Sequence, residues 1–199
     1  MSKKDRYGKF KKKDYVRMIE NTVWFLCRKF GYKTKPYLFE TKLRDDAIMV
    51  YTHRGKHSAI FYDYMRFKDL FGHFDYETQE AYVSAITAHE MRHYYQHRQI
   101  WAKKPKEKDS VIERWRKDEM IEDDESVEYV LQPMELDAFL YEYCFGAQYF
   151  DAILIKSVRD EAHLDAMEKL YVEYFGETDE ALFGEEIRAI LRKRKTRRA

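Results

Sequence analysis

Two histidines four residues apart, with a glutamate directly after the first, are the residues best suited to chemistry. They lie in the stretch AITAHEMRHYYQHRQ, where His89, Glu90 and His93 match the pattern H-E-x-x-H. On a helix, residues four apart project from one face a turn apart, so both imidazoles can meet one metal ion. Glu90 points round the helix from them and can act as a general base on a water molecule there. The pattern predicts a catalytic zinc site.

A helix with two solvent-facing or hydrogen-bonded histidines and no metal is the alternative. The apolar stripe of the surrounding segment argues against it, because Tyr82, Ile86 and Ile100 share that stripe with the two histidines. Buried imidazoles need partners, since burying an unpaired polar group costs free energy. A shared zinc ion would satisfy both of them.

The third ligand decides the class of zinc site. A metzincin would have a third histidine six residues beyond His93 and a glycine midway, where this sequence has Gln99 and Gln96. His97 lies one further helical turn along and is too far away to share a metal with the H-E-x-x-H histidines on a straight helix. We therefore expect a carboxylate from a later helix.

The segment PMELDAF (133–139) supplies two candidate carboxylates, Glu135 and Asp137. Both interrupt an apolar run, where burying a carboxylate is costly unless it is paired or binds a metal. Glu135 also has a structural explanation, because an acid in the first turn of a helix that starts at Pro133 favours the free amides there. We predict Glu135 as the ligand, with Asp137 as the alternative, and a site that uses neither acid as the third interpretation.

HEMRHYYQ followed by ELDAF resembles the gluzincin-type zincin metallopeptidases, most nearly the ImmA/IrrE-like enzymes of bacteria and mobile elements. In that family the H-E-x-x-H helix is followed by a helix with an E-x-x-A pattern, and Glu135 stands three residues before Ala138. The family has an asparagine or aspartate after the alanine, where this sequence has Phe139. The charged segment 102–126 also lengthens the separation between the two motifs.

The resemblance extends over roughly residues 12–150, and its specific part is the two short motifs. It implies a zincin-like fold with Zn²⁺ bound by His89, His93 and Glu135. It also implies that Glu90 is the catalytic base. The last 45 or so residues have no counterpart in the family.

The pattern of apolar residues predicts an α+β fold around the H-E-x-x-H helix. Three short β-branched or aromatic runs predict a small, mainly antiparallel sheet of about three strands: 37–43, 47–52 and 58–64. HRGK (53–56) is expected as a hairpin turn around Gly55. Helical spacing predicts an N-terminal helix, the H-E-x-x-H helix and further C-terminal helices: 12–31, 76–100, 129–150 and 155–195.

We expect a zincin-like metallopeptidase domain over residues 1–154, followed by a C-terminal helical extension over residues 155–199. Within the first, 102–126 is a charged insertion, in which Ile112 and Trp115 suggest a partly docked helix. The extension is expected to hold two amphipathic helices separated near residues 176–180.

The chain ends in a basic tail, RKRKTRR (192–198). A solvated helix end is the preferred interpretation, because positive charge favours the C-terminal dipole. A weak contact with nucleic acid or another polyanion is the alternative. No aromatic residue lies among these charges.

Composition excludes several classes of protein. The sequence is 45% hydrophobic and 17% aromatic, which is too apolar for a disordered chain. Its net charge of +1 gives no strong field for nucleic acid or a membrane. The N-terminus has no apolar signal region, and no run is long and apolar enough for a membrane span. Cys27 and Cys144 lack metal or redox spacing, so we expect two buried thiols in a cytoplasmic protein.

Three further assignments depend on position in the chain. In zincins the strand before the catalytic helix holds an extended peptide by backbone pairing, and 58–64 stands there in order. An ordinary sheet strand is the alternative. Tyr94, Tyr95 and His97 are candidate donors to an oxyanion, although packing is the preferred interpretation of the tyrosines, because tyrosine is common in this sequence. Three histidines are expected in loops without function: His53, His57 and His73.

The expected function is that of a zinc-dependent metallopeptidase, which hydrolyses a protein or peptide substrate with metal-activated water. The alternative is a zincin-like binding module with a structural metal, which contacts a protein or nucleic-acid partner. Glu90 discriminates between them, because a structural site has no use for a base beside the metal. Hydrolysis of a non-peptide amide is a third possibility.

Overall fold

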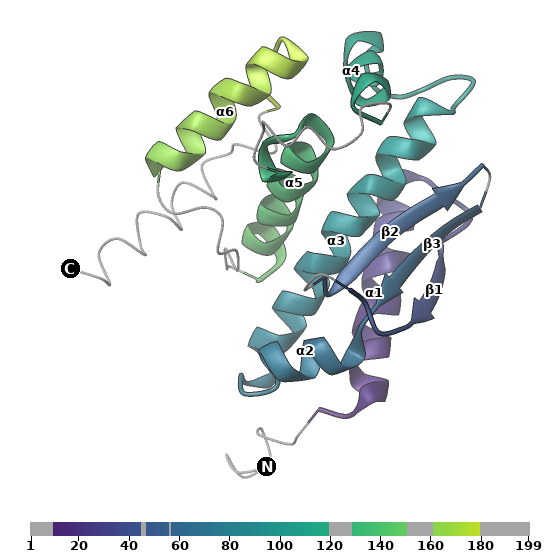
Figure 1. Cartoon of the computed structure of the whole chain (residues 1–199), viewed down its shortest axis with the longest axis vertical. Helices are drawn as coiled ribbons and strands as arrows, with labels where there is room; N and C mark the ends of the chain where they lie inside the picture. The colour runs from purple at the N-terminus through teal and green to yellow at the C-terminus, as the bar shows by residue number, and fades with distance from the viewer. Residues whose placement is uncertain (1–9, 45–46, 56, 120–128, 151–160, 180–199) are drawn as a thin grey trace. The chain divides into compact units, whose positions relative to one another are not determined.

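A computed structural model describes residues 10–44, 47–55, 57–119, 129–150 and 161–179 (Figure 1). The chain divides into two compact units, Met1–Tyr94 and Tyr95–Ala199, and each is described by itself below. Among the described residues, six α-helices and three strands make an α+β protein, as predicted. None of the described helices combines the length and apolar character that crossing a membrane requires.

The N-terminal unit begins with helix α1 (Lys12–Phe30), which confirms the predicted helix. Its buried residues recur at helical spacing, and Ile19, Val23 and Leu26 are fully buried. Gly31 ends the helix with φ 74°, a left-handed conformation that glycine adopts without a steric penalty. The amide of Gly31 donates to the carbonyl of Arg28 across 3.0 Å.

Three strands form one sheet: β1 (Tyr37–Glu40), β2 (Met49–Arg54) and β3 (His57–Tyr62). Their order is β1-β3-β2, in which β2 and β3 are an antiparallel hairpin and β1 pairs with β3 in parallel. Gly55 lies in the hairpin turn with φ 58°, as expected. The sheet is therefore mixed, and the prediction of a mainly antiparallel sheet is wrong for β1.

The sheet order also corrects the prediction of a peptide-binding strand. β3 has a neighbour on both sides, so residues 57–62 offer no free edge. The alternative, an ordinary sheet strand, is the correct interpretation. β2 is an edge strand, and it contacts the H-E-x-x-H helix directly. The backbone amide of Tyr51 in β2 donates a hydrogen bond to Glu90.

A short helix after the sheet, α2 (Tyr64–Phe71), was not predicted. Asp63 is its N-cap, and its carboxylate accepts hydrogen bonds from the amides of Met65 and Arg66. Phe67 and Phe71 anchor the helix to the core. β3 therefore ends at Tyr62, before the N-cap Asp63, whereas the apolar pattern extended the strand to residue 64.

Helix α3 (Tyr76–Ile100) is the predicted H-E-x-x-H helix. Asp75 precedes it and accepts a hydrogen bond from the amide of Thr78 across 2.8 Å, which caps the helix. Burial is not restricted to the predicted stripe, because Val83, Ala88 and Met91 on other faces are fully buried. The middle of α3 is thus a core helix, and its polar residues there need partners inside the protein.

In the C-terminal unit, the described elements after α3 are α4 (Asp109–Glu119), the 3-10 turn η2 (Tyr129–Leu131), α5 (Pro133–Phe150) and α6 (Glu161–Phe175). Trp115 of α4 is completely buried, and its ring lies 6.4 Å from the rings of both Tyr95 and Phe175. The predicted docked helix in the charged segment is confirmed. α5 begins at Pro133, as the sequence indicated.

The predicted C-terminal extension is described only in part. α6 matches the first of its two expected helices and ends before Gly176. The second helix and the basic tail lie outside the described residues. The domain boundary predicted at residue 154 falls within residues 151–160, which also lie outside them, and stays a prediction.

Candidate metal centre

His89 and His93 face each other on adjacent turns of α3. Their Nε2 atoms are 3.1 Å apart, and the side chains are buried, with 8% and 9% exposed. Bonds of 2.0–2.1 Å to a tetrahedral zinc ion would place two nitrogens about 3.3 Å apart. The two imidazoles therefore already have nearly the separation that one shared ion requires.

Glu135 completes a group of three possible ligands. One nitrogen of each histidine and one carboxylate oxygen of Glu135 lie within 4.8 Å of one another. Glu135 is in the first turn of α5, next to the buried residues Met134 and Leu136. Two imidazoles and one carboxylate, all on described residues, are a donor set that can bind a metal ion.

Asp137, the alternative ligand, has a structural contact. It is completely buried, and its Oδ2 accepts a hydrogen bond of 2.6 Å from Nε2 of Gln96. The same Gln96 nitrogen donates to the carbonyl of Met134 across 3.0 Å. Gln96 thus binds the first turn of α5 on both sides of Glu135, and in this way it helps to set the position of that carboxylate.

Glu90 is held by the edge strand of the sheet. Its Oε2 accepts a hydrogen bond of 2.6 Å from the backbone amide of Tyr51 in β2, and the side chain is 7% exposed. A carboxylate has about four lone-pair positions, so one amide leaves capacity for further hydrogen bonds. The contact fixes the glutamate on the side of α3 that faces β2.

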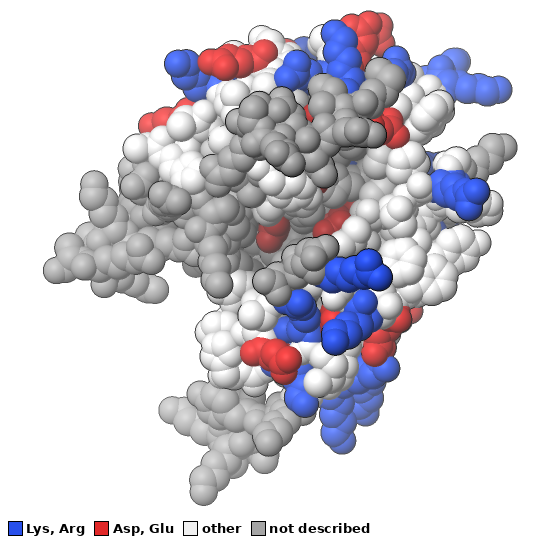
Figure 2. Space-filling model, viewed as in Figure 1, with Lys and Arg blue, Asp and Glu red and all other residues white. Residues whose placement is uncertain are grey.

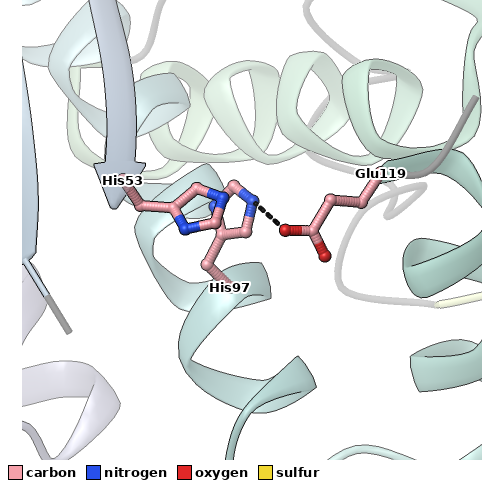
Figure 3. Close-up of side chains that lie close together, drawn as sticks. All are labelled: His53, His97 and Glu119. Atoms are coloured by element: carbon pink, nitrogen blue, oxygen red, sulfur yellow. Dashed lines mark ion pairs between the residues drawn. The ribbon is translucent and has the colours of Figure 1, made fainter. Parts of the chain in front are cut away.

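His97 takes part in a different contact from His89 and His93. Its Nε2 lies 3.4 Å from Oε1 of Glu119, at the end of α4 (Figure 3). Figure 3 also draws His53, and one ligand atom from each of these three side chains lies within 4.8 Å of the others. They form a second group of possible ligands, which the sequence analysis did not find.

The missed residues had weak signals. His97 continues the spacing of four residues that begins at His89, which marks it as a member of the same helix face. Glu119 lies 22 positions later in a run rich in acids, where nothing distinguishes it from its neighbours. His53 was expected in a loop but is in β2, and His57 likewise is in β3.

The candidate oxyanion donors Tyr94 and Tyr95 have hydroxyl partners elsewhere. Tyr94 donates to the carbonyl of Thr34 across 3.0 Å, and Tyr95 donates to Glu107 across 2.6 Å. Both tyrosines are buried. These contacts support the packing interpretation.

Comparisons of the chain with protein-family models, with curated proteins and with solved structures gave no match. The likeness to gluzincin-type enzymes therefore depends on the H-E-x-x-H and E-x-x-A residues alone. What stands on the structure itself is a cluster of His89, His93 and Glu135 that can bind a metal ion.

Proposed function

We propose that the chain is a zinc-dependent metallopeptidase, with His89, His93 and Glu135 as ligands and Glu90 as general base. The observation that carries the proposal is the 3.1 Å separation between the Nε2 atoms of His89 and His93, together with Glu90, which directly follows His89 in the sequence. Catalytic zinc sites typically combine three protein ligands with one open position. The cluster provides that number of ligands.

The donor types favour zinc over the common hard cations. Mg²⁺ and Ca²⁺ prefer sites made of oxygen atoms, whereas imidazole nitrogens suit zinc and other transition metals. When bound, zinc supplies Lewis-acid chemistry, which polarises a carbonyl oxygen and makes water a stronger acid. The remaining chemistry belongs to the residues of this chain.

Glu90 is the residue that moves the proton. In peptide hydrolysis, its carboxylate accepts a proton from water while the water oxygen bonds to the carbonyl carbon. As the carbon–nitrogen bond breaks, Glu90 returns that proton to the leaving amine. The hydrogen bond from the Tyr51 amide holds the carboxylate in place for both transfers.

β2 is the strand proposed to bind an extended peptide. It is an edge of the sheet, and at Tyr51 its outward amide points toward Glu90. Backbone pairing along an edge strand is a common way to hold a peptide in extended form. Because the Tyr51 amide is donated to Glu90, a peptide would pair with the other backbone groups of β2, along the strand that also contacts the base.

One observation favours a second candidate, a zincin-like binding module with a structural metal. The Tyr51–Glu90 hydrogen bond gives Glu90 a structural role that needs no catalysis. The substitutions Glu90→Gln and Glu90→Ala separate the two candidates. Glutamine can still accept the amide hydrogen bond but cannot act as a base, whereas alanine can do neither.

The test is hydrolysis of a mixed library of quenched fluorescent peptides by purified, zinc-loaded protein. The proposal expects Glu90→Gln to keep its zinc while cleavage falls by about 10²–10⁴-fold, the usual contribution of a general base. Glu80→Gln, the same change about three turns earlier on α3, is the matched control and should cleave at the wild-type rate. A substrate cleaved equally by Glu90→Gln and wild type would refute the peptidase mechanism.

A further inference from the structure

A second group of metal-ligating side chains lies outside the proposed peptidase site. It consists of His53 of β2, His97 of α3 and Glu119 of α4, and one ligand atom of each lies within 4.8 Å of the others. Figure 3 shows the three side chains converging from these three elements. We call His53, His97 and Glu119 the second cluster.

His53 approaches His97 because β2 and α3 are held together at one contact, the hydrogen bond from the Tyr51 amide to Glu90. His53 is two residues beyond Tyr51 and therefore on the same side of the strand, and their rings stack at 6.3 Å with an interplanar angle of 13°. His97 is seven residues beyond Glu90 on the same unbroken helix, which is about two turns along one face. The strand and helix that hold Glu90 thus also bring the two histidines together.

The separation of His97 and Glu119, both in the C-terminal unit, fits two ligands of one metal ion. Nε2 of His97 lies 3.4 Å from Oε1 of Glu119. An N–H···O hydrogen bond usually spans about 2.7–3.2 Å. A nitrogen and an oxygen bound to one tetrahedral zinc ion, in contrast, lie about 3.3–3.5 Å apart. The observed distance is therefore long for a direct hydrogen bond and suitable for a shared ion.

The donor types select the class of ion. Two imidazoles and one carboxylate suit zinc and other transition metals, whereas Mg²⁺ and Ca²⁺ prefer sites made of oxygen atoms. An ion pair between His97 and Glu119 is the ordinary alternative, and it uses two of the three side chains. A metal ion uses all three, which is the number of protein ligands that zinc sites with one open position have.

The surface over α4 carries charges of both signs. Figure 2 shows Lys, Arg, Asp and Glu side chains intermingled at the top of the view, over this helix. Its sequence, DSVIERWRKDE, likewise combines acids and bases. A mixed surface of this kind produces no strong field of one sign. Binding of a cation by the second cluster therefore depends on the three ligands themselves.

The second cluster is more open to solvent than the H-E-x-x-H site. His53 and His97 are half-buried, whereas His89 and His93 are buried. The shell around a metal site controls how readily solvent reaches it. We therefore expect an ion at the second cluster to exchange with water more readily and to be removed by dialysis.

We propose that His53, His97 and Glu119 bind a second transition-metal ion, and that zinc fills this site when it is in excess. The bound ion connects β2, α3 and α4 at one point. Because it binds the folded chain, it also raises the stability of the fold by mass action. The site does not depend on the proposed peptidase activity.

The test is calorimetric titration of the full chain with Zn²⁺, after the chain has been loaded with zinc and dialysed. Wild type should take up one further equivalent of zinc, and its melting temperature should rise. His53→Ala and Glu119→Gln should each abolish the further uptake and the rise, because too few ligands remain for binding. Both variants should keep the zinc that survives dialysis, which checks that they are folded. His57→Ala, at an exposed histidine of β3, is the matched control and should bind like wild type.

Glu135→Ala separates the second cluster from the H-E-x-x-H site. It should lose the zinc that survives dialysis and keep the further uptake. The proposal is wrong if dialysed wild type takes up no further zinc, or if His53→Ala and Glu119→Gln take up as much as wild type. It is also wrong if Glu135→Ala abolishes the further uptake, since all of these residues would then serve one site.

Discussion

The backbone amide of Tyr51 donates a hydrogen bond to the Glu90 carboxylate across 2.6 Å, although the two residues are 39 positions apart. Tyr51 is on the edge strand β2, and Glu90 stands between the two histidines of the H-E-x-x-H motif. The contact connects the sheet to the helix at the residue proposed as base. The position of the Glu90 side chain therefore depends on the sheet as well as on α3.

The first prediction follows from this contact. Glu90→Ala leaves the partly buried Tyr51 amide without its acceptor, which should lower the free energy of unfolding by about 1–3 kcal/mol. Glu90→Gln keeps an acceptor oxygen and should lose less. Urea unfolding of metal-free protein measures both, and equal stability of the alanine and wild-type proteins would show that the contact contributes nothing.

The second prediction concerns Asp137 and Gln96. Asp137→Ala leaves Gln96 without its buried carboxylate partner and should destabilise the protein by about 1–3 kcal/mol. In a double-mutant cycle with Gln96→Ala, the two changes should show a coupling energy of roughly 0.5–3 kcal/mol. Asp137→Asn should weaken zinc binding by about 10–100-fold, the size typical of losing a residue that supports a ligand. Strictly additive effects on stability would contradict the direct pairing.

Local patterns predicted much of the fold and of the candidate site. Spacing of apolar residues located α1 and α3, Pro133 located the start of α5, and the two motifs located the three possible ligands. Each of these signals can be recognised in a short stretch of sequence, because helix periodicity and helix caps depend on neighbouring residues. The same locality explains the failures.

Most of the failures depend on contacts between distant residues. β1 pairs with β3 in parallel, but the connection 41–48 is compatible with either neighbour and gives no sign of the choice. The pairing of Asp137 with Gln96, 41 positions away, likewise leaves no sign in the local pattern. Helix α2 is the exception, since Asp63 is a recognisable N-cap that the strand pattern hid.

A third prediction separates His97 from the metal centre. His97→Ala should leave the zinc of the metal centre in place, because His97 lies 3.4 Å from Glu119, outside the group formed by His89, His93 and Glu135. Stability should fall by roughly 0.5–1.5 kcal/mol, the usual net contribution of one polar contact between side chains that are mostly buried. The measurement is zinc per chain after dialysis, compared with His93→Ala as the variant that should lose metal. Loss of zinc from both variants would show that His97 also takes part in binding the zinc that survives dialysis, contrary to the prediction.

The fourth prediction concerns alkaline pH. Burial raises the pKa of Tyr15 to about 12, and Tyr15 also donates a hydrogen bond to Gln79. Between the ordinary tyrosine pKa of 10.0 and about 12, the unfolded chain loses this proton while the folded chain keeps it. The unfolded state then binds fewer protons, so stability is full below pH 10 and falls as pH rises.

Tyr15→Phe should therefore make the fall in stability above about pH 10 less steep, as measured by urea unfolding at several pH values. Tyr37→Phe, a change at an exposed tyrosine, is the control and should leave the slope as in wild type. An identical slope for Tyr15→Phe and wild type would contradict the effect of burial.

The most direct test of the proposed metal centre is the zinc content of the purified chain, measured by mass spectrometry of the metal and set against protein concentration. The proposal predicts one zinc per wild-type chain. It predicts almost none after dialysis of Glu135→Ala, because two histidines alone leave zinc with too few protein ligands for tight binding. A wild-type chain that retains no zinc, or a Glu135→Ala chain that retains a full equivalent, would contradict it.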